Sequence, residues 1–424
     1  MLTAVVGINW GDEGKGRMVD LLSADYDIVC RYQGGNNAGH TVVNDYGKSI
    51  LNLLPCGIFR EHTVNVLGAG MVIDLEHLCN EIDGIVSKGI KITPDNLKIS
   101  DRATICLPYH VLLDELEEDR LGDKKYGSTR RGIAPVYSDK YMKKSLRMID
   151  LFDFAALKAN LTDIIEWKNL FIVEGYKSEA IKVDEMFAWL QKYGERILPF
   201  ITDTTAYLEK AADDGKKIMF EGQLGTLRDI EYGIYPYTSS SQTIAAYATT
   251  GAGIPFKTLD NTIGIMKAFS TCVGAGPFTA EFFGEEAHKF REVSEEFGAA
   301  TGRPRRVGGF DVVASRYGVK IQGASYLALT KLDMIAYFDR IPVCVAYEID
   351  DVQTQDFPSG ERLMRAKPVY EYLPGFKADI TKCRKIEDLP QEAIAYIKYV
   401  EQAVKCPIKY VSVGPARDDY IEVR

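Results

Sequence analysis

The sequence predicts an α/β protein built around a mainly parallel β-sheet. Short runs rich in β-branched and aromatic residues recur between longer helical patterns, and several runs are almost wholly apolar, as in strands buried on both faces. Glycine-rich or polar segments follow many of these runs, where open α/β sheets carry their ligand sites. The nine expected strands are residues 2–8, 26–32, 64–70, 96–100, 216–222, 261–269, 325–333, 341–349 and 408–414.

The length of 424 residues allows one large domain or two ordinary ones. No internal repeat, low-complexity tract or linker rich in Pro, Gly or Ser divides the chain. Residues from about Asp150 to Asp214 have a helical pattern. We therefore expect a single domain over residues 1–424, with a helical subdomain at about 150–214.

Composition and charge exclude several classes of protein. The formal net charge of −9 opposes non-specific nucleic-acid binding. The eight cysteines lie far apart without a CxxC pair, so neither a zinc cluster nor a disulfide framework is indicated. No charged leader precedes the first strand, and no apolar run approaches the ~20 residues needed to span a bilayer. We expect a cytoplasmic protein with no nucleic-acid or membrane partner.

The loop GINWGDEGKGR, residues 7–17, follows the first strand and has the character of a phosphate site. Glycines let backbone amides approach a ligand, and Lys15 supplies a point charge. However, it is not a Walker A loop of the form GxxxxGK[ST]. Aligning its GK pair puts Asn9 where the leading glycine belongs and Gly16 where the magnesium-binding hydroxyl belongs.

Two carboxylates, Asp12 and Glu13, lie inside this loop. Negative charge does not help an ordinary loop to bind phosphate. A carboxylate is useful there only if it binds a cation or accepts a proton. The loop therefore indicates chemistry as well as binding.

The second polar stretch, RYQGGNNAGHTVV, follows the strand at 26–32 and contains His40. An isolated histidine is more often structural than catalytic. Here GGNNAGH combines a flexible backbone with amide side chains and an imidazole, a set suited to holding an anion beside a proton donor or electrostatic stabiliser. Together the two loops indicate phosphoryl chemistry.

A third motif, TKLD at 330–333, ends the strand at 325–333. It resembles the guanine-reading motif of GTP-binding proteins, in which the carboxylate accepts from the ring N1 and the exocyclic amine while the lysine stem covers the base. The four-residue pattern alone also fits an exposed strand end with a charged pair. The glycine loop upstream favours guanine reading.

Four further segments complete the pattern: GSTRRGIAPVYSDK at 127–140, FEGQLGTLRDIEYGIYPYTSSS at 220–241, KAFSTCVGAGPF at 267–278 and GAATGRPRRVGGFD at 298–311. In this order and spacing the set resembles the adenylosuccinate synthetase family, from GDEGKGR to the terminal SVGPARDD, and WGDEGKG and ATGRPRR are specific to that family. The resemblance implies a GTP-binding ligase fold, with a large mainly parallel central sheet flanked by helices and with helical and small β subdomains.

The resemblance also implies an activity and a mechanism. The family joins L-aspartate to the 6-position of IMP with GTP and Mg²⁺, through 6-phosphoryl-IMP, and releases adenylosuccinate, GDP and phosphate in AMP biosynthesis. Asp12 matches the base that removes the N1 proton and also ligates Mg²⁺, and Gly39 matches a carbonyl ligand of the metal. His40 matches the acid that stabilises charge during transfer, and Lys15 neutralises phosphate oxygens.

Binding positions carry over from the same motifs. The GTP site comprises Gly11, Asp12, Glu13, Gly14, Lys15, Gly16, Arg17, Gly39, His40, Thr41, Arg305, Lys331, Leu332, Asp333, Ser412, Val413 and Gly414. The IMP site comprises Asp12, Asn37, Ala38, Gly39, His40, Thr129, Lys143, Gln223, Ser239 and Arg303. The aspartate site comprises Val273, Ala299, Ala300, Thr301, Gly302, Arg303 and Arg305. Lys143 replaces an arginine that reaches the IMP phosphate of a partner subunit, so the resemblance implies a homodimer with shared active sites.

The sequence departs from the family pattern near the purine and aspartate sites. The amide of the usual FEGAQG falls on Gln223, and Leu224 takes the next position; the other departures are Lys143, Ser239, Cys272, Ala300 and Gly309. These changes spare the residues of phosphoryl transfer. We expect retained catalysis, with IMP as the favoured acceptor and another 6-oxopurine nucleotide, GMP or dGMP, as the alternative.

Two other classes of function remain as alternatives. A guanine-nucleotide switch protein would use the guanine motif and the phosphate loop, but the missing Walker A anchors count against it. A catalytically silent interaction protein is disfavoured because Asp12 and His40 are both present.

Overall fold

The computed structural model describes residues 1–298 and 302–423. Its centre is a ten-stranded sheet. Every neighbouring pair of strands in it is parallel, except that β20 runs antiparallel to β19 at one edge. In order across the sheet the strands are β20 (Tyr420–Glu422), β19 (Ile408–Ser412), β15 (Tyr326–Thr330), β11 (Asn261–Lys267), β1 (Leu2–Gly7), β10 (Ile218–Glu221), β2 (Ile28–Arg31), β5 (Val64–Leu67), β7 (Leu97–Ser100) and β9 (Ile201–Thr202). The expected α/β fold class is confirmed.

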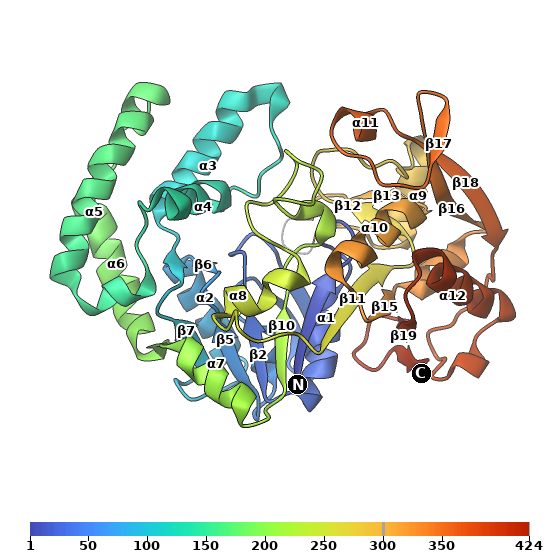
Figure 1. Cartoon of the computed structure of the whole chain (residues 1–424), viewed down its shortest axis with the longest axis horizontal. Coiled ribbons are helices and arrows are strands. Elements are labelled where there is room, and N and C mark those ends of the chain that lie inside the picture. The colour runs from blue at the N-terminus through green and yellow to red at the C-terminus, as the bar shows by residue number, and fades with distance from the viewer. Residues whose placement is uncertain (299–301, 424) are drawn as a thin grey trace.

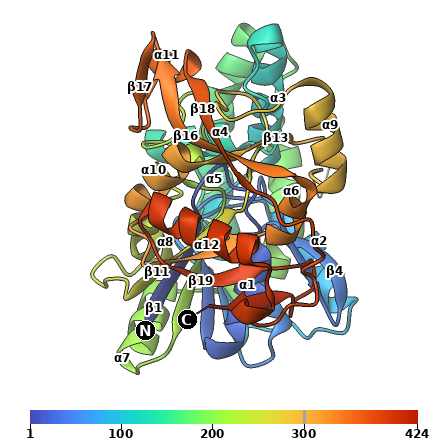
Figure 2. The same ribbon diagram turned by 90° about the vertical axis from the view of Figure 1, so that its right-hand side faces the viewer.

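Twelve α-helices surround the sheet in the described part of the chain. They are α1 (Lys15–Leu22), α2 (Leu75–Val86), α3 (Pro108–Leu121), α4 (Ile133–Met142), α5 (Phe154–Asn169), α6 (Val183–Ile197), α7 (Thr204–Asp213), α8 (Ala248–Ala252), α9 (Gly284–Val293), α10 (Val312–Gln322), α11 (Glu361–Met364) and α12 (Gln391–Val404). Helices α3 to α6 gather at one end of the molecule (Figure 1). Helix α12 lies across the sheet near β19 (Figure 2), and its Tyr396 and Val400 share a buried cluster with Leu327 and Ile408.

One expected strand lies outside the central sheet. The run at 341–349 forms β16 (Arg340–Ile349), which pairs in parallel with β14 (Phe310–Asp311) and antiparallel with β17 (Val352–Thr354) and β18 (Lys367–Pro374). The expectation that this run joins the parallel sheet is wrong. An apolar run indicates that both faces of a strand are covered, and here α10 is among the elements that pack against β16. The run does not indicate which strand it pairs with.

Three two-stranded sheets complete the fold. They are β3 (His40–Asn44) with β4 (Gly47–Leu51), β6 (Val72–Ile73) with β8 (Thr104–Ile105), and β12 (Ser270–Cys272) with β13 (Arg306–Gly308). None of the helices in the described ranges is long and apolar enough to cross a membrane.

Parallel order decides where the polar motifs meet. Strands β1, β2, β10, β11, β15 and β19 all run in the same direction, so the segments that follow them leave at the same edge of the sheet. Ligands of open α/β sheets bind at this carboxyl edge. The phosphate loop, the GGNNAGH loop, the FEGQLG turn, the KAFSTCVG segment and the TKLD motif are therefore brought together there.

Candidate active site

The phosphate loop is held in shape by its own second acid. Glu13 is buried, and its Oε1 accepts hydrogen bonds from the backbone N–H groups of Asn9 (3.0 Å) and Gly11 (2.7 Å). Its Oε2 lies 2.8 Å from Nζ of Lys15, which also donates to the Gly11 carbonyl at 3.1 Å. The Glu13 side chain thus faces into the loop and pairs with Lys15. Helix α1 begins at Lys15, so its amino end points at the expected phosphate position.

The first acid, Asp12, faces three polar side chains from other segments. Its Oδ2 accepts from the Thr271 hydroxyl at 2.7 Å and lies 3.5 Å from Nζ of Lys267 and 3.7 Å from Nε of Arg305. Burial raises the pKa of Asp12, but Lys267, Arg305 and the Thr271 hydrogen bond outweigh burial and hold that pKa well below its usual range. Asp12 is therefore a carboxylate surrounded by cations.

A buried glutamate that sequence reasoning missed joins these cations. Glu296 receives Nζ of Lys267 at 2.9 and 3.0 Å, Nη1 of Arg305 at 2.6 Å and Nζ of Lys331 at 2.6 Å. Burial raises the pKa of Glu296, but the three cations outweigh it and the net shift is downward. One carboxylate thus links the Asp12 site, the aspartate loop and the guanine motif. Lys267 was also missed, although the sequence contains one sign of it: a charged residue at the end of an otherwise apolar strand.

His40 lies in a second buried ionic cluster. Its Nδ1 is 2.5 Å from Oε1 of Glu221, which is also 3.0 Å from Nη2 of Arg31. Burial lowers the pKa of His40, as does Arg31, and Glu221 only partly offsets them, so this pKa is about 4. The other ring nitrogen, Nε2, is buried and has no hydrogen-bond partner among the described residues.

The TKLD motif is a tight turn beside the C-terminal segment. Lys331 has a left-handed backbone (φ 58°), Leu332 is fully buried, and Asp333 is the second residue of the short 3₁₀-helix Leu332–Tyr337. Burial raises the pKa of Asp333, while Lys331 and Arg17 oppose the shift.

Arg17 reaches the C-terminal turn that contributes to the expected GTP site. Its guanidinium donates to the Ser412 hydroxyl at 2.7 Å, to the Asp419 carbonyl at 2.9 Å, and to the carbonyls of Gly414 and Ala416. The first helix and the last loop are therefore tied together at the expected guanine site.

The IMP positions lie on loops with several open polar atoms. The Asn37 Oδ1 accepts from the Gly35 N–H at 3.3 Å, and the Ser239 hydroxyl lies 3.0 Å from that of Ser241. Gln223 is buried, and its Oε1 has no hydrogen-bond partner in the described part of the chain. Gln33, which sequence reasoning did not single out, also has a buried Oε1 without a partner among the described residues. Buried, unpaired amide oxygens are rare in folded proteins and mark a place where a ligand donor fits.

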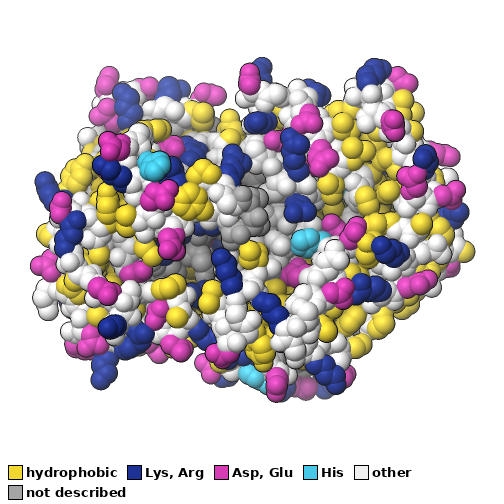
Figure 3. All heavy atoms as spheres, turned by 180° about the vertical axis from the view of Figure 1, so that it is seen from behind, with side chains coloured by type: hydrophobic (Ala, Val, Ile, Leu, Met, Phe, Trp, Pro, Cys, Tyr) yellow, Lys and Arg dark blue, Asp and Glu magenta, His cyan; other side chains and the backbone are white. Residues whose placement is uncertain are grey.

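The remaining predicted positions fall into three groups. Thr129 is exposed on a loop that also includes Gly127. This loop lies close to Ala275 and Arg303, because a Cβ added at Gly127 would be 3.7 Å from the Ala275 backbone nitrogen and 4.0 Å from Nη1 of Arg303. Lys143 is exposed at the end of α4, where its backbone is left-handed (φ 60°). Ala299, Ala300 and Thr301 lie outside the described residues. Lys and Arg side chains are scattered among Asp and Glu side chains over the face of the molecule that Figure 3 shows.

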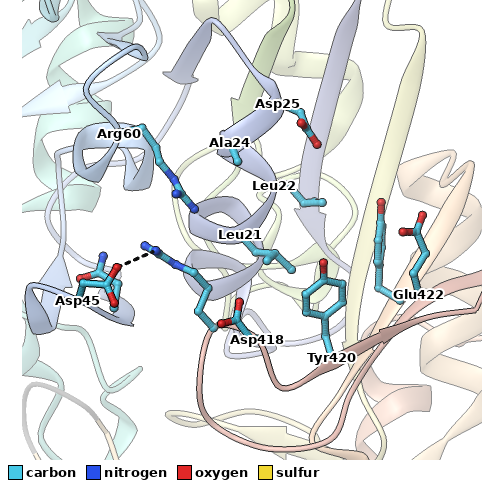
Figure 4. Close-up of a pocket in the computed structure, with 12 residues that line it drawn as sticks. Leu21, Leu22, Ala24, Asp25, Asp45, Arg60, Asp418, Tyr420 and Glu422 are labelled. Carbon is cyan, nitrogen blue, oxygen red and sulfur yellow. Dashed lines mark ion pairs between the residues drawn. The ribbon is translucent and has the colours of Figure 1, made fainter. Parts of the chain in front are cut away.

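A separate cavity of about 430 Å³ lies beside the far end of α1, lined by Arg60, Tyr420 and other residues of α1 and the C-terminal strands (Figure 4). There Arg417 pairs with Asp20 at 2.7 Å and lies 3.8 Å from Asp45. None of the predicted site residues lines this cavity. The candidate active site is instead the convergence of loops at the carboxyl edge of the sheet.

Comparison with known proteins gives one consistent result. The family model "Adenylosuccinate synthetase" matches residues 4–421. A protein named adenylosuccinate synthetase from Streptococcus gordonii is 43% identical over 98% of this chain and 96% of its own length. One from Caldanaerobacter subterraneus subsp. tengcongensis is 42% identical over 100% of this chain and 99% of its own length.

Solved structures agree with the sequence comparisons. A fully ligated adenylosuccinate synthetase from Plasmodium falciparum superposes with a TM-score of 0.93 at 33% identity, covering 100% of this chain and 99% of that one. A cyanophage succinoaminodeoxyadenylate synthetase bound to dGMP and dATP has a TM-score of 0.61 at 17% identity, over 99% of this chain and 95% of that one, and shows the fold alone. The resemblance found in the sequence is confirmed, and this chain belongs to the adenylosuccinate synthetase family.

Proposed function

We propose that this chain is a GTP-dependent ligase that joins L-aspartate to the 6-position of IMP through 6-phosphoryl-IMP, giving adenylosuccinate, GDP and phosphate in AMP biosynthesis. The observation that carries the proposal is the position of Asp12: a carboxylate inside a phosphate loop, next to Thr271, Lys267 and Arg305. A simple nucleotide switch has no use for this arrangement, because it places a proton acceptor where the phosphoryl group is transferred.

Asp12 is proposed to take the N1 proton of IMP, so that the 6-oxygen becomes a nucleophile toward the γ-phosphate of GTP. The neighbouring cations by themselves make this carboxylate a weak base. Bound phosphates place negative charge beside the same cations, which raises the basicity of Asp12 when it is needed. Lys15, now paired with Glu13, is within the same loop and can turn to the phosphate oxygens.

The proposed magnesium site is formed by Asp12 and the carbonyl of Gly39. A carboxylate and a backbone carbonyl are the oxygen ligands that Mg²⁺ prefers, and both residues are accessible to solvent. When bound, Mg²⁺ would neutralise the phosphate oxygens of GTP. The assignments of the GTP, IMP and aspartate contacts stand as proposals on the same basis, with Asp333 reading guanine and Arg303 facing IMP and aspartate.

We propose that the enzyme is a cytoplasmic homodimer and that each chain works as one ligase domain. Lys143 matches the family position that reaches the partner's IMP phosphate, so the proposal assigns it to the partner's site. Exposed apolar side chains near it support an interface: Tyr141 is 62% exposed and Met142 is 50% exposed. Tyr141 also accepts a hydrogen bond from Gln242 at 3.2 Å, which extends this surface toward the Ser239 loop.

The proposed function is tested by incubating the protein with GTP, Mg²⁺ and L-aspartate, and with IMP, GMP or dGMP in separate reactions. Phosphate release and the ultraviolet spectrum of the product are followed. We expect turnover that requires both aspartate and IMP. Turnover with GMP or dGMP in place of IMP would reassign the acceptor, and nucleotide binding without aspartate-dependent turnover would reject the ligase.

A further inference from the structure

Glu221 is a buried carboxylate with no role in the functions assigned above. It ends β10, and the sheet register places it opposite Arg31 at the end of β2. Both side chains are fully buried, and their closest atoms are 3.0 Å apart. A charged pair this far from water is costly unless every oxygen of the carboxylate is satisfied.

Four donors converge on this carboxylate. Its Oε2 accepts the backbone N–H of Cys56 at 2.7 Å. Its Oε1 lies 3.0 Å from Nη2 of Arg31, 2.5 Å from Nδ1 of His40 and 3.1 Å from Sγ of Cys56. The carboxylate is thus enclosed by donors from three other segments of the chain.

These contacts decide which nitrogen of His40 carries the proton. Nη2 of Arg31 lies 2.9 Å from Nδ1 as well, and arginine can only donate. If Nδ1 accepted from Arg31, its lone pair would face the carboxylate oxygen at 2.5 Å, which is repulsive. The consistent reading is that Arg31 and Nδ1–H both donate to Oε1, and the 2.9 Å separation arises because the two donors converge on one oxygen.

The other ring nitrogen is left for a ligand. Nε2 is buried and unpartnered among the described residues. The ring is close to the phosphate loop, because a Cβ added at Gly16 would lie only 2.6 Å from Cβ of His40. In this tautomer Nε2 is the nitrogen that can accept a proton, and once it carries one it would donate toward the transferred phosphoryl oxygens, while the carboxylate behind the ring stabilises the imidazolium.

We propose that Glu221 is a positioning residue for phosphoryl transfer: it accepts Nδ1–H of His40 and thereby fixes the tautomer and the ring orientation that present Nε2 to the substrates. This inference rests on the proposed function, since it requires His40 to act at the transfer step. Arg31 keeps Glu221 in its ionised form, and the same device, a buried carboxylate that orients an imidazole, is well established in other enzymes.

The tautomer can be measured on the unaltered protein. The chain has five histidines, so in protein with nitrogen-15-labelled histidine the signals of His40 are assigned by their loss in His40→Asn. We expect Nδ1 in the protonated range and Nε2 in the unprotonated range. The reverse pattern would overturn the inference, whatever the activity of any variant.

Glu221→Gln tests the consequence for catalysis, and Glu81→Gln is the matched control. Glu81 is also mostly buried and accepts the N–H groups of Asn52 and Leu53, both at 3.0 Å, but it does not contact His40. For Glu221→Gln we expect kcat to fall roughly 10²-fold, KM for GTP, IMP and aspartate to stay within about 3-fold, and His40 to show mixed tautomers. Glu81→Gln should keep kcat within about 2-fold and leave the tautomer unchanged.

The two levels of the proposal fail in different ways. If His40→Asn is inactive but Glu221→Gln keeps the parent kcat, the positioning role is wrong and the proposed function stands. If His40→Asn itself keeps full activity, the role at the transfer step that the family resemblance implies for His40 is wrong. If Glu221→Gln does not fold, the nitrogen-15 measurement on the unaltered protein decides.

Discussion

The guanine site gives the most discriminating prediction, through Asp333→Asn. As a carboxylate, Asp333 accepts from N1 and from the 2-amino group of guanine. An asparagine of nearly the same size presents one amide donor where an acceptor is needed. Xanthosine triphosphate carries a 2-oxo group instead of the 2-amino group, so the variant should prefer XTP.

The size of the effect follows from the number of hydrogen bonds and the local environment. Hydrogen bonds to a charged group contribute about 1.5–3 kcal/mol each, so two contribute about 3–6 kcal/mol. Asp333 is only partly buried and Arg17 and Lys331 share its charge, which favours the lower half of that range. Since 1.4 kcal/mol is a factor of ten, KM for GTP should rise roughly 10²-fold and the preference for GTP over XTP should invert.

The assay is turnover in which GTP, XTP and ATP compete at fixed IMP and aspartate. Asp339→Asn is the control, because the Asp339 side chain is 92% exposed and pairs with Lys377 at 3.2 Å. It should leave the preference unchanged. An Asp333→Asn protein that folds and still prefers GTP by the parent ratio would refute the assignment of the guanine site.

Three further predictions address the base, the dimer and the pH dependence of stability. Asp12→Asn should lower turnover by ~10² to 10⁴ in a phosphate-release assay while the fold is retained, and activity within a few fold of the parent would contradict its role as base. Lys143→Ala should raise KM for IMP but not for GTP, and mixing it with Asp12→Asn should restore activity in heterodimers; no recovery after proven subunit exchange would contradict a shared site. Burial raises the pKa of Asp311 from its ordinary value of 3.8 to about 6, against hydrogen bonds that include one from Tyr347. Because the pKa of Asp311 is higher in the folded than in the unfolded protein, the free energy of unfolding should fall by up to about 3 kcal/mol as the pH rises from about 4 to about 6. Urea unfolding of Asp311→Asn should lack this fall, and the same pH dependence in the variant and the parent would contradict the prediction.

The strands, and the edge of the sheet where the site forms, could be predicted because both follow from the order of apolar and polar residues along the chain. An apolar run reports burial, and a parallel sheet brings the segments after its strands to one edge. Eight of the nine expected strands accordingly lie in the central sheet. The exception, β16, has the same apolar pattern as the others, and pairing partners depend on contacts that a local pattern does not contain.

The ionic clusters around Asp12 and His40 were not predictable in the same way. His40 and Glu221 are 181 positions apart in the sequence, and Thr271 and Asp12 are 259 apart. A single charged residue such as Glu296 has no motif of its own, and it normally lies at the surface. Only the fold reveals that it holds Lys267, Arg305 and Lys331 together.

The residues that depart from the family pattern differ in how their neighbours compensate for the change. At position 272 the thiol lies 3.2 Å from Nη2 of Arg228, which also donates to the Val273 carbonyl at 2.5 Å. A guanidinium therefore still supports this segment although residue 272 is a cysteine.

At Gly309, an added Cβ would lie 2.8 Å from the ring of Tyr370 and 2.8 Å from the Pro342 carbonyl, so Tyr370 fills the space that a larger residue would need. The neighbours of these two positions thus give no reason to expect a different acceptor. Gln223 differs, because its unpartnered Oε1 lies on the side of the GGNNAGH loop, 2.7 Å from a Cβ built at Gly34. Among the described departures it is the one with a buried polar atom that lacks a partner there, so a change in acceptor preference should appear first in variants of Gln223.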